Sequence, residues 1–282
     1  MNPTARSRPF QQVDVFSSQP YRGNPLAVVL DAEGLDSATM QQFANWTNLS
    51  ESTFLLPPKD PRADYRVRIF TGMEEFPFAG HPTLGSAHAW LEAGGVPKSG
   101  ADVVQECAAG LVRVKRDGGR LAFVAPPLTR FGTVEASARQ QLAAALRVRP
   151  EDILDASWLV NGPEWIGVLL ESAEKVLALA PDYAAMGNLK IGAIGPCPAG
   201  DGPDFEVRTF LPGDAMAEDP VTGSFNAGAA QWLMETGRAP ERYVASQGTV
   251  LGRAGRIHVS AEDGDIWVGG YSTTGIRGSV ML

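Results

Sequence analysis

The segment YRVRIF at residues 65–70 returns as FEVRTF at residues 205–210, displaced by 205 − 65 = 140 positions. The same displacement relates VVL at 28–30 to VLL at 168–170. Half of the 282 residues is 282/2 = 141, so one displacement spans half of the chain. Self-similarity at a fixed spacing is typical of an internal duplication. The sequence therefore predicts two similar domains.

The expected boundary between the two domains lies near residue 130, just after Pro126-Pro127. It gives an N-terminal domain of residues 1–130 and a C-terminal domain of residues 131–282. Each is long enough to bury a hydrophobic core of its own. The sequence leaves open whether the last strand, near residues 272–282, stays in the second domain or returns to the first.

The pattern of short elements predicts an α+β fold. Runs rich in Val, Ile, Phe and Leu, bounded by Gly, Pro and Asp, are typical of strands. The helices that begin near Pro82 and Pro220 carry almost no charge on any face, and such helices are usually buried all round. We therefore expect two pseudo-symmetric domains, in each of which a mostly antiparallel, barrel-like sheet wraps a central helix.

Composition limits the partners of this chain. Its net charge is 24 − 32 = −8, which disfavours nucleic acid and anionic membranes because those partners need a basic surface. Cys107 and Cys197 do not have the spacing of metal ligands, so no metal is expected. The N-terminal residues do not resemble a secretory signal, and no apolar run approaches the ~18 residues of a membrane span. We expect a cytoplasmic protein with free thiols.

The starts of the two uncharged helices resemble each other: HPTLGS at 81–86 matches DPVTGS at 219–224, displaced by 138 positions. His81 and Asp219 are expected at the N-cap positions, each followed by a proline in the first helical position. Free N–H groups and the helix dipole attract anions there. If the two starts face one another across a cleft between the domains, a small carboxylate is held by Gly80, His81, Gly223 and Ser224. The alternative is that His81 and Asp219 only cap helices.

Glu51 is the other candidate. It stands in NLSESTF at 48–54, where a helix is expected to end and an apolar strand to begin. Carboxyl groups that enter apolar strands tend to have a raised pKa, which suits a group that takes and returns a proton near neutral pH. The position displaced by 140 is Ile191, so the fold does not require an acid there. A solvated acid at a strand end is the structural alternative.

Four segments in order along nearly the whole chain resemble the PhzF family of phenazine-biosynthesis-like isomerases. They are RGNPLAVVL (22–30), NLSESTF (48–54), FAGHPTLGSA (78–87) and EDPVTGS (218–224). The resemblance implies the diaminopimelate epimerase-like fold, in which two similar domains each wrap a sheet round a central helix. It also implies proton transfer without a cofactor on a small carboxylate-bearing substrate.

The resemblance also implies roles for individual residues. Glu51 matches the acid that removes a proton from one ring carbon and delivers it to another. His81 and Asp219 match residues that assist proton traffic and polarise the substrate. The positions that hold the substrate carboxylate match Gly80, Gly223 and Ser224. The sequence departs from the family pattern at Ser52, where Thr is common, and at Thr71-Gly72, where Thr-Pro is common.

Two other functions remain open from the sequence. One is an epimerase-like or dehydratase-like enzyme of the same fold. Related racemases use two opposed cysteines, but Cys107 and Cys197 lie outside the repeated segments, which disfavours that chemistry. The other is a binding or scaffold protein without catalysis. Family analogy also suggests a homodimer.

Several repeated residues are expected to be structural. Arg68 and Arg208 recur in the matching strands, which favours a pairing role over a catalytic one. His88, Trp90 and Trp232 lie late in the two uncharged helices and are expected in the core.

Overall fold

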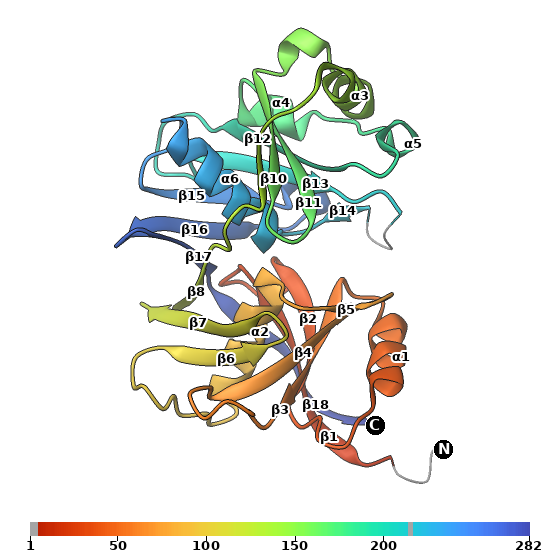
Figure 1. Cartoon of the computed structure of the whole chain (residues 1–282), viewed down its shortest axis with the longest axis vertical. Coiled ribbons are helices and arrows are strands. Elements are labelled where there is room, and N and C mark those ends of the chain that lie inside the picture. Colours follow the sequence, from red (N-terminus) through yellow and green to blue (C-terminus); the bar gives the residue numbers. More distant parts are fainter. Residues whose placement is uncertain (1–4, 214–216) are drawn as a thin grey trace. The chain divides into compact units, whose positions relative to one another are not determined.

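Two compact units make up the protein in this computed structural model, which describes residues 5–213 and 217–282. Unit 1 contains the residues up to Val124 together with Gly269–Leu282, and unit 2 contains Ala125–Val268. The C-terminal strand β18 (Ser272–Met281) pairs antiparallel with β1 (Ser7–Val15) in unit 1, and Figure 1 shows these two strands side by side. The last strand therefore belongs with the first.

The remaining elements of unit 1 are β2 (Asn24–Val29), α1 (Ser37–Thr47), β3 (Glu51–Leu56), β4 (Tyr65–Thr71), β5 (Glu75–Phe76), α2 (Gly80–Glu92), β6 (Val103–Cys107), β7 (Gly110–Asp117) and β8 (Arg120–Val124). Unit 2 contains β9 (Arg130–Thr133), α3 (Ala136–Leu146), η1 (Pro150–Asp152), β10 (Asp155–Val160), β11 (Glu164–Leu169), α4 (Ala173–Leu177), α5 (Tyr183–Met186), β12 (Lys190–Pro196), β13 (Phe205–Phe210), β14 (Glu218–Asp219), α6 (Gly223–Glu235), β15 (Arg242–Gln247), η2 (Thr249–Leu251) and β16 (Gly255–Glu262). Strand β17 (Asp265–Gly270) carries the chain from unit 2 to unit 1.

The two units share one pattern of strand pairing. In unit 1, β2 pairs parallel with β3, and β4 pairs parallel with β6. In unit 2, β11 pairs parallel with β12, and β13 with β15. Most other pairs, among them β1 with β2 and β10 with β11, are antiparallel. The expected mostly antiparallel α+β sheet is confirmed.

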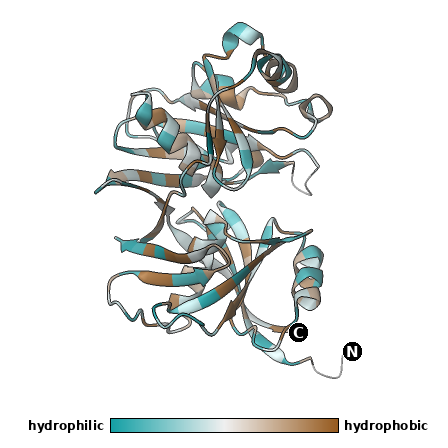
Figure 2. Ribbon diagram, viewed as in Figure 1, coloured by the Kyte–Doolittle hydropathy of each residue, from teal (hydrophilic) through white to brown (hydrophobic). Residues whose placement is uncertain are grey.

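The repeated strands β4 and β13 carry the same Arg–Glu contact. Arg68 Nε donates to Glu75 at 2.7 Å, and Arg208 Nε donates to Glu218 at 2.8 Å. Each guanidinium lies 5.0 Å from the ring centre of the phenylalanine two residues on. The alternation of hydrophilic and hydrophobic residues along β4 is visible in Figure 2. These arginines pair structurally, as the repeat predicted.

Each unit has one mostly buried helix without charged residues in its buried turns. α2 contacts β1, β2, β3, β6, β7, β8 and β18, so strands surround it. A Cβ on Gly85 would lie 2.6 Å from Leu26 and 2.9 Å from Val15, which explains the glycine by close approach. In unit 2, α6 contacts β10, β11 and β16, and a Cβ on Gly228 would lie 3.1 Å from Leu159.

Of the three residues of these helices that were expected in the core, one is buried and two are half-buried. Trp232 is buried, as predicted. Trp90 is only half-buried and stacks on Tyr65 with ring centres 5.5 Å apart. His88 is also half-buried, with its Nε2 3.0 Å from the Thr274 hydroxyl of β18.

The Arg–Glu pairs offer a matched test of burial. Arg208→Met leaves Glu218 inside unit 2 without its cation, since the two side chains are 4% and 10% exposed. We expect a loss of about 3–5 kcal/mol in the free energy of unfolding. Arg68→Met breaks the more exposed pair and is expected to cost about 1 kcal/mol. Urea unfolding of both variants measures the difference, and equal losses would contradict the burial argument.

Candidate functional site

The structure brings Glu51 and His81 together in unit 1. Glu51 is the first residue of β3 and lies opposite Thr71 of β4, while His81 is the second residue of α2. Glu51 Oε2 and His81 Nε2 are 3.6 Å apart, and the side chains are 14% and 5% exposed. This distance exceeds that of a hydrogen bond, so the imidazole does not fix the carboxyl group. The two groups form a small, largely dry pair of possible proton carriers.

His81 is neutral at physiological pH. Burial lowers the pKa of His81 from its ordinary value to about 3. A neutral imidazole has one N–H donor and one acceptor nitrogen. The neutral imidazole of His81 can therefore donate or accept a proton, or polarise an oxygen atom. It does not place a fixed positive charge beside Glu51.

Local structure fixes the strand end that carries Glu51. Helix α1 ends at Asn48, whose left-handed backbone (φ 56°) turns the chain towards β3. From α1, Gln41 Nε2 donates to Thr71 O at 2.8 Å and Asn45 Nδ2 donates to Gly72 O at 2.9 Å. Gly72, which departs from the family pattern, and its neighbour Thr71 are thus bound to α1 beside the candidate acid.

The register of the sheets corrects the expected counterpart of Glu51. Phe70 lies opposite both Ser52 and Glu75, and Phe210 lies opposite both Ile191 and Glu218. Ser52 is therefore the counterpart of Ile191, and Glu51 is the counterpart of Lys190. The prediction that paired Glu51 with Ile191 was wrong by one residue, because strand β12 is shifted by one position relative to the repeat in β13. Lys190 still shows that unit 2 has no acid at this place.

The expected helix starts are also wrong. α2 begins at Gly80 with Ala79 as N-cap, and α6 begins at Gly223 with Thr222 as N-cap. A proline in the third helical position fits α2, since the first four N–H groups of a helix need no helical partner. In unit 2 the start is later because Asp219 is still paired in β14, opposite Thr209.

His81 and Asp219 are consequently not structural equivalents. In β5 and β14, the residue opposite Ile69 is Phe76 and the residue opposite Thr209 is Asp219. Because α2 and α6 both span 13 residues from a glycine, His81 corresponds to Ser224. The displacement of 138 residues aligns Pro82 with Pro220 in the sequence, but these two prolines do not occupy equivalent positions in the two units.

Asp219 is buried at the end of β14, just before α6, and is bound by neutral side chains. Its Oδ2 accepts a hydrogen bond from the Thr222 hydroxyl at 2.6 Å, and its backbone oxygen accepts one from Gln247 Nε2 at 3.1 Å. Thr222, Thr209 and Asn226 also contact Gln247. Sequence reasoning missed these four residues. Polar residues inside otherwise apolar segments, such as Asn226 in α6, were the available signal.

The hydroxyl of Ser224 accepts a hydrogen bond from an indole, so its own hydrogen can be donated to another group. Its Oγ accepts from Trp165 Nε1 at 3.0 Å, and an indole nitrogen only donates. Its backbone oxygen accepts from Asn161 Nδ2 at 2.8 Å. Neither α2 nor α6 has an N-cap side chain bonded to its first turn. The N–H groups that begin at Gly80 and Gly223 are thus not used by such caps, which fits the expected binding of an anion.

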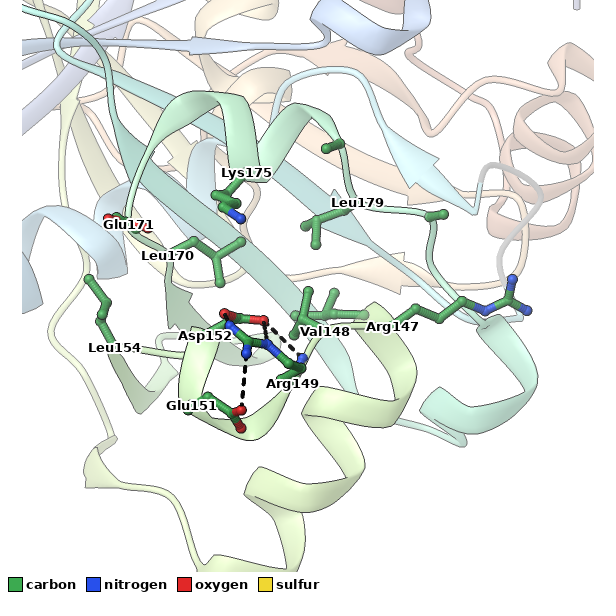
Figure 3. Close-up of a pocket in the computed structure, with 13 residues that line it drawn as sticks. Arg147, Val148, Arg149, Glu151, Asp152, Leu154, Leu170, Glu171, Lys175 and Leu179 are labelled. Carbon is green, nitrogen blue, oxygen red and sulfur yellow. Dashed lines mark hydrogen bonds and ion pairs between the residues drawn. The ribbon is translucent and has the colours of Figure 1, made fainter.

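A separate cavity of about 560 Å³ lies in unit 2, between the end of α3, η1 and α4. Figure 3 shows Arg149 on its wall, bound to Asp152 and Glu151. None of the predicted site residues lines it. Within residues 5–213 and 217–282, no cluster of three His, Cys, Asp or Glu side chains is arranged to hold a metal ion, and no helix is long and apolar enough to cross a membrane.

The neutral state of His81 predicts a pH dependence of stability. Its pKa of about 3 in the folded protein lies below the value of about 6.5 expected in an unfolded chain. Between these values the unfolded chain binds a proton that the folded protein does not, so stability falls as the pH drops below 6.5. His81→Gln removes this titrating group. Between pH 7 and pH 4.5, we expect the free energy of unfolding of the variant to fall by about 2 kcal/mol less than that of the wild type.

Urea unfolding at the two pH values measures this difference. His88→Gln, on the same helix, is the comparison: burial also lowers the pKa of His88, but Glu92 opposes that shift, so this variant should remove less of the pH dependence than His81→Gln. The same pH dependence in His81→Gln and the wild type would contradict a buried neutral imidazole.

Known proteins resemble this chain over almost its full length. The family described as phenazine biosynthesis-like protein (PhzC-PhzF) matches residues 13–278. Antisense-enhancing sequence 1 of Schizosaccharomyces pombe is 36% identical, covering 97% of this chain and 98% of that protein. Trans-2,3-dihydro-3-hydroxyanthranilate isomerase of Pseudomonas aeruginosa is 34% identical, covering 89% of each.

Solved structures agree with these relatives. A PhzF-family phenazine biosynthesis protein of Enterococcus faecalis matches with a TM-score of 0.80 and 25% identity, covering 98% of this chain and 100% of that one. A hydroxyproline epimerase of Agrobacterium vitis shares the fold alone, with a TM-score of 0.60 and 15% identity over 98% and 93% of the two chains. The expected epimerase-like fold is confirmed. The chain belongs to the PhzF family of phenazine biosynthesis-like isomerases.

Proposed function

We propose that this PhzF-family isomerase moves a proton between two carbon atoms of a small cyclic carboxylate, with Glu51 as the single group that takes and returns it. The observation that carries the proposal is the pair formed by Glu51 and neutral His81, 3.6 Å apart and largely shielded from water. General acid–base catalysis needs a positioned group that can exist in both protonation states. A carboxyl group at the start of an apolar strand meets that need.

His81 is proposed to assist Glu51 by passing or polarising a proton. Its neutral state supports this role, because a permanent imidazolium would favour the carboxylate form of Glu51 and hinder the return of the proton. In unit 2, Asp219 is proposed to take part in proton traffic. The backbone N–H groups of Gly80 and Gly223 and the hydroxyl of Ser224 are proposed to bind the substrate carboxylate.

The proposed substrate class follows from this chemistry and from the relatives. Uncapped helix starts and a serine hydroxyl suit a carboxylate. Relatives over most of the chain are named for an isomerase of a dihydroanthranilate, which is a cyclic carboxylate. No cofactor takes part in the proposed proton transfer.

Racemisation by two thiols is not supported. Cys107 ends β6 and Cys197 follows β12, so neither residue belongs to the helix starts at Gly80 and Gly223. Burial raises the pKa of both thiols, which disfavours the thiolate that such a base requires.

Deuterium exchange tests the proposal. The protein is incubated in D2O with trans-2,3-dihydro-3-hydroxyanthranilate and with a panel of cyclic carboxylic acids, and incorporation is followed by mass spectrometry. We expect the wild type to isomerise or label at least one compound, and Glu51→Gln to lower that rate by about 10²- to 10⁴-fold.

Glu206→Gln is the matched control for this substitution. Glu206 is a buried glutamate on β13, outside the pair of Glu51 and His81, so the same substitution is made at a buried acid of the other unit. It is expected to leave the rate unchanged. Wild-type rates in Glu51→Gln would reject Glu51 as the shuttle. No reaction of the wild type with any compound would reject the isomerase and favour a binding protein, a reading that the non-enzymatic name of the Schizosaccharomyces pombe relative also permits.

A further inference from the structure

We propose that Gln247, Thr209 and Thr222 form a one-way chain of hydrogen bonds that ends on Asp219 and holds this carboxyl group in its ionised form. These three are positioning residues, since each acts through Asp219. The proposal deepens the proposed function and rests on it for the catalytic role of Asp219. The chain itself follows from the contacts within unit 2 alone.

Two backbone groups fix the orientation of the Gln247 amide. On one side the backbone N–H of Thr222, which can only donate, lies 3.0 Å from Oε1. On the other side the backbone oxygen of Asp219, which can only accept, lies 3.1 Å from Nε2. A flipped amide would place donor against donor and acceptor against acceptor. Gln247 Nε2 therefore only donates, and its two hydrogens are shared among the backbone oxygen of Asp219 and the hydroxyls of Thr209 and Thr222.

The direction of the two threonine hydroxyls follows from that orientation. Thr209 Oγ1 lies 2.9 Å from Gln247 Nε2 and 2.6 Å from Thr222 Oγ1. Because the nitrogen cannot accept, Thr222 Oγ1 is the acceptor that remains for the Thr209 hydrogen among these contacts, and the Thr209 hydroxyl donates to it. The Thr222 hydroxyl then donates to Asp219 Oδ2, at 2.6 Å.

Every hydrogen in this chain points towards Asp219. A proton on Oδ2 would oppose the Thr222 hydroxyl, and turning that hydroxyl towards Thr209 would leave the Thr209 hydrogen without an acceptor in this chain. Hydrogen bonds to the charged form favour that form. The setting strengthens the effect, since Thr209, Thr222 and Gln247 are at most 5% exposed. Of the charged residues on the elements around Asp219, Arg208 and Glu218 are bound to each other, and Arg253 lies beside Gly248, whose backbone approaches Pro220.

The same amide also sets the start of α6. Gln247 Oε1 accepts from the N–H of the N-cap Thr222 and from Asn226 Nδ2, one turn into the helix. Gln247 thus joins the carboxyl group of Asp219 to the helix turn that carries Gly223 and Ser224. A single side chain aligns the proposed proton carrier of unit 2 with the proposed anion-binding groups.

Titration of Asp219 in the ligand-free protein tests the chain without any assay of activity. The carboxyl carbons of aspartate are labelled with ¹³C, and the Asp219 signal is assigned by its absence in Asp219→Asn. We expect Thr222→Val to move the titration midpoint of this signal to higher pH. Thr209→Val should move it in the same direction by less, because Thr222 then keeps its bond to Asp219. Thr222→Ser should restore the wild-type midpoint.

Thr83→Val is the matched control in unit 1. Thr83 is fully buried on a helix and accepts from a glutamine amide, Gln105, at 2.9 Å, so the substitution removes the same group from the same kind of contact. In Thr83→Val, the titration midpoint of the Asp219 signal should equal that of the wild type. An unchanged midpoint in both Thr222→Val and Thr209→Val would overturn the proposal. If Thr222→Val does not fold, Thr209→Val alone decides.

Turnover separates failure of this chain from failure of the proposed function. With a compound that the wild type isomerises, Thr222→Val should lower kcat by about tenfold and shift the pH profile as the NMR midpoint shifts. A shifted midpoint with an unchanged pH profile would reject the role of Asp219 but keep the chain. If the wild type isomerises none of the compounds, the proposed function is rejected, but the titration of Asp219 still tests the chain of hydrogen bonds.

Discussion

In each unit, a mostly buried helix without charged residues in its buried turns is the constraint on which the rest of the structure depends. Strands surround α2 and pack on α6, so the polar atoms of these helices have little access to water and need partners inside the unit. Ser86 therefore bonds to Thr53, Thr83 to Gln105, and Asn226 to Gln247. The first turns, where N–H groups have no helical partner, are the places where such a helix can bind a ligand.

The two units place different side chains on the same frame. The Arg–Glu pairs at Arg68 and Arg208 and the parallel strand pairs recur in both. At the helix starts, unit 1 has a neutral imidazole beside a carboxyl group, and unit 2 has a serine hydroxyl held by an indole. A duplicated scaffold thus supports proton-carrying groups that need not be symmetric, which agrees with transfer by one group more than with two opposed bases.

The sequence predicted the fold well, because a repeat of hydrophobic strands and uncharged helices survives changes of single residues. It predicted the site less fully. The one-residue shift that makes Lys190, and not Ile191, the counterpart of Glu51 depends on strand register, which sequence spacing does not encode. The N-caps were misplaced because strand pairing holds Asp219 outside α6. Gln247 could not be found, since its partners Thr209 and Thr222 come to it only through the sheet.

The central claim is that one buried group carries the proton from one carbon to the other. Trans-2,3-dihydro-3-hydroxyanthranilate labelled with deuterium at the carbon that loses its proton tests this in ordinary water, in a single turnover. Because the Glu51 side chain is only 14% exposed, we predict that a measurable share of the deuterium appears on the accepting carbon of the product. Product that forms with complete loss of the label to water would contradict transfer by Glu51 alone.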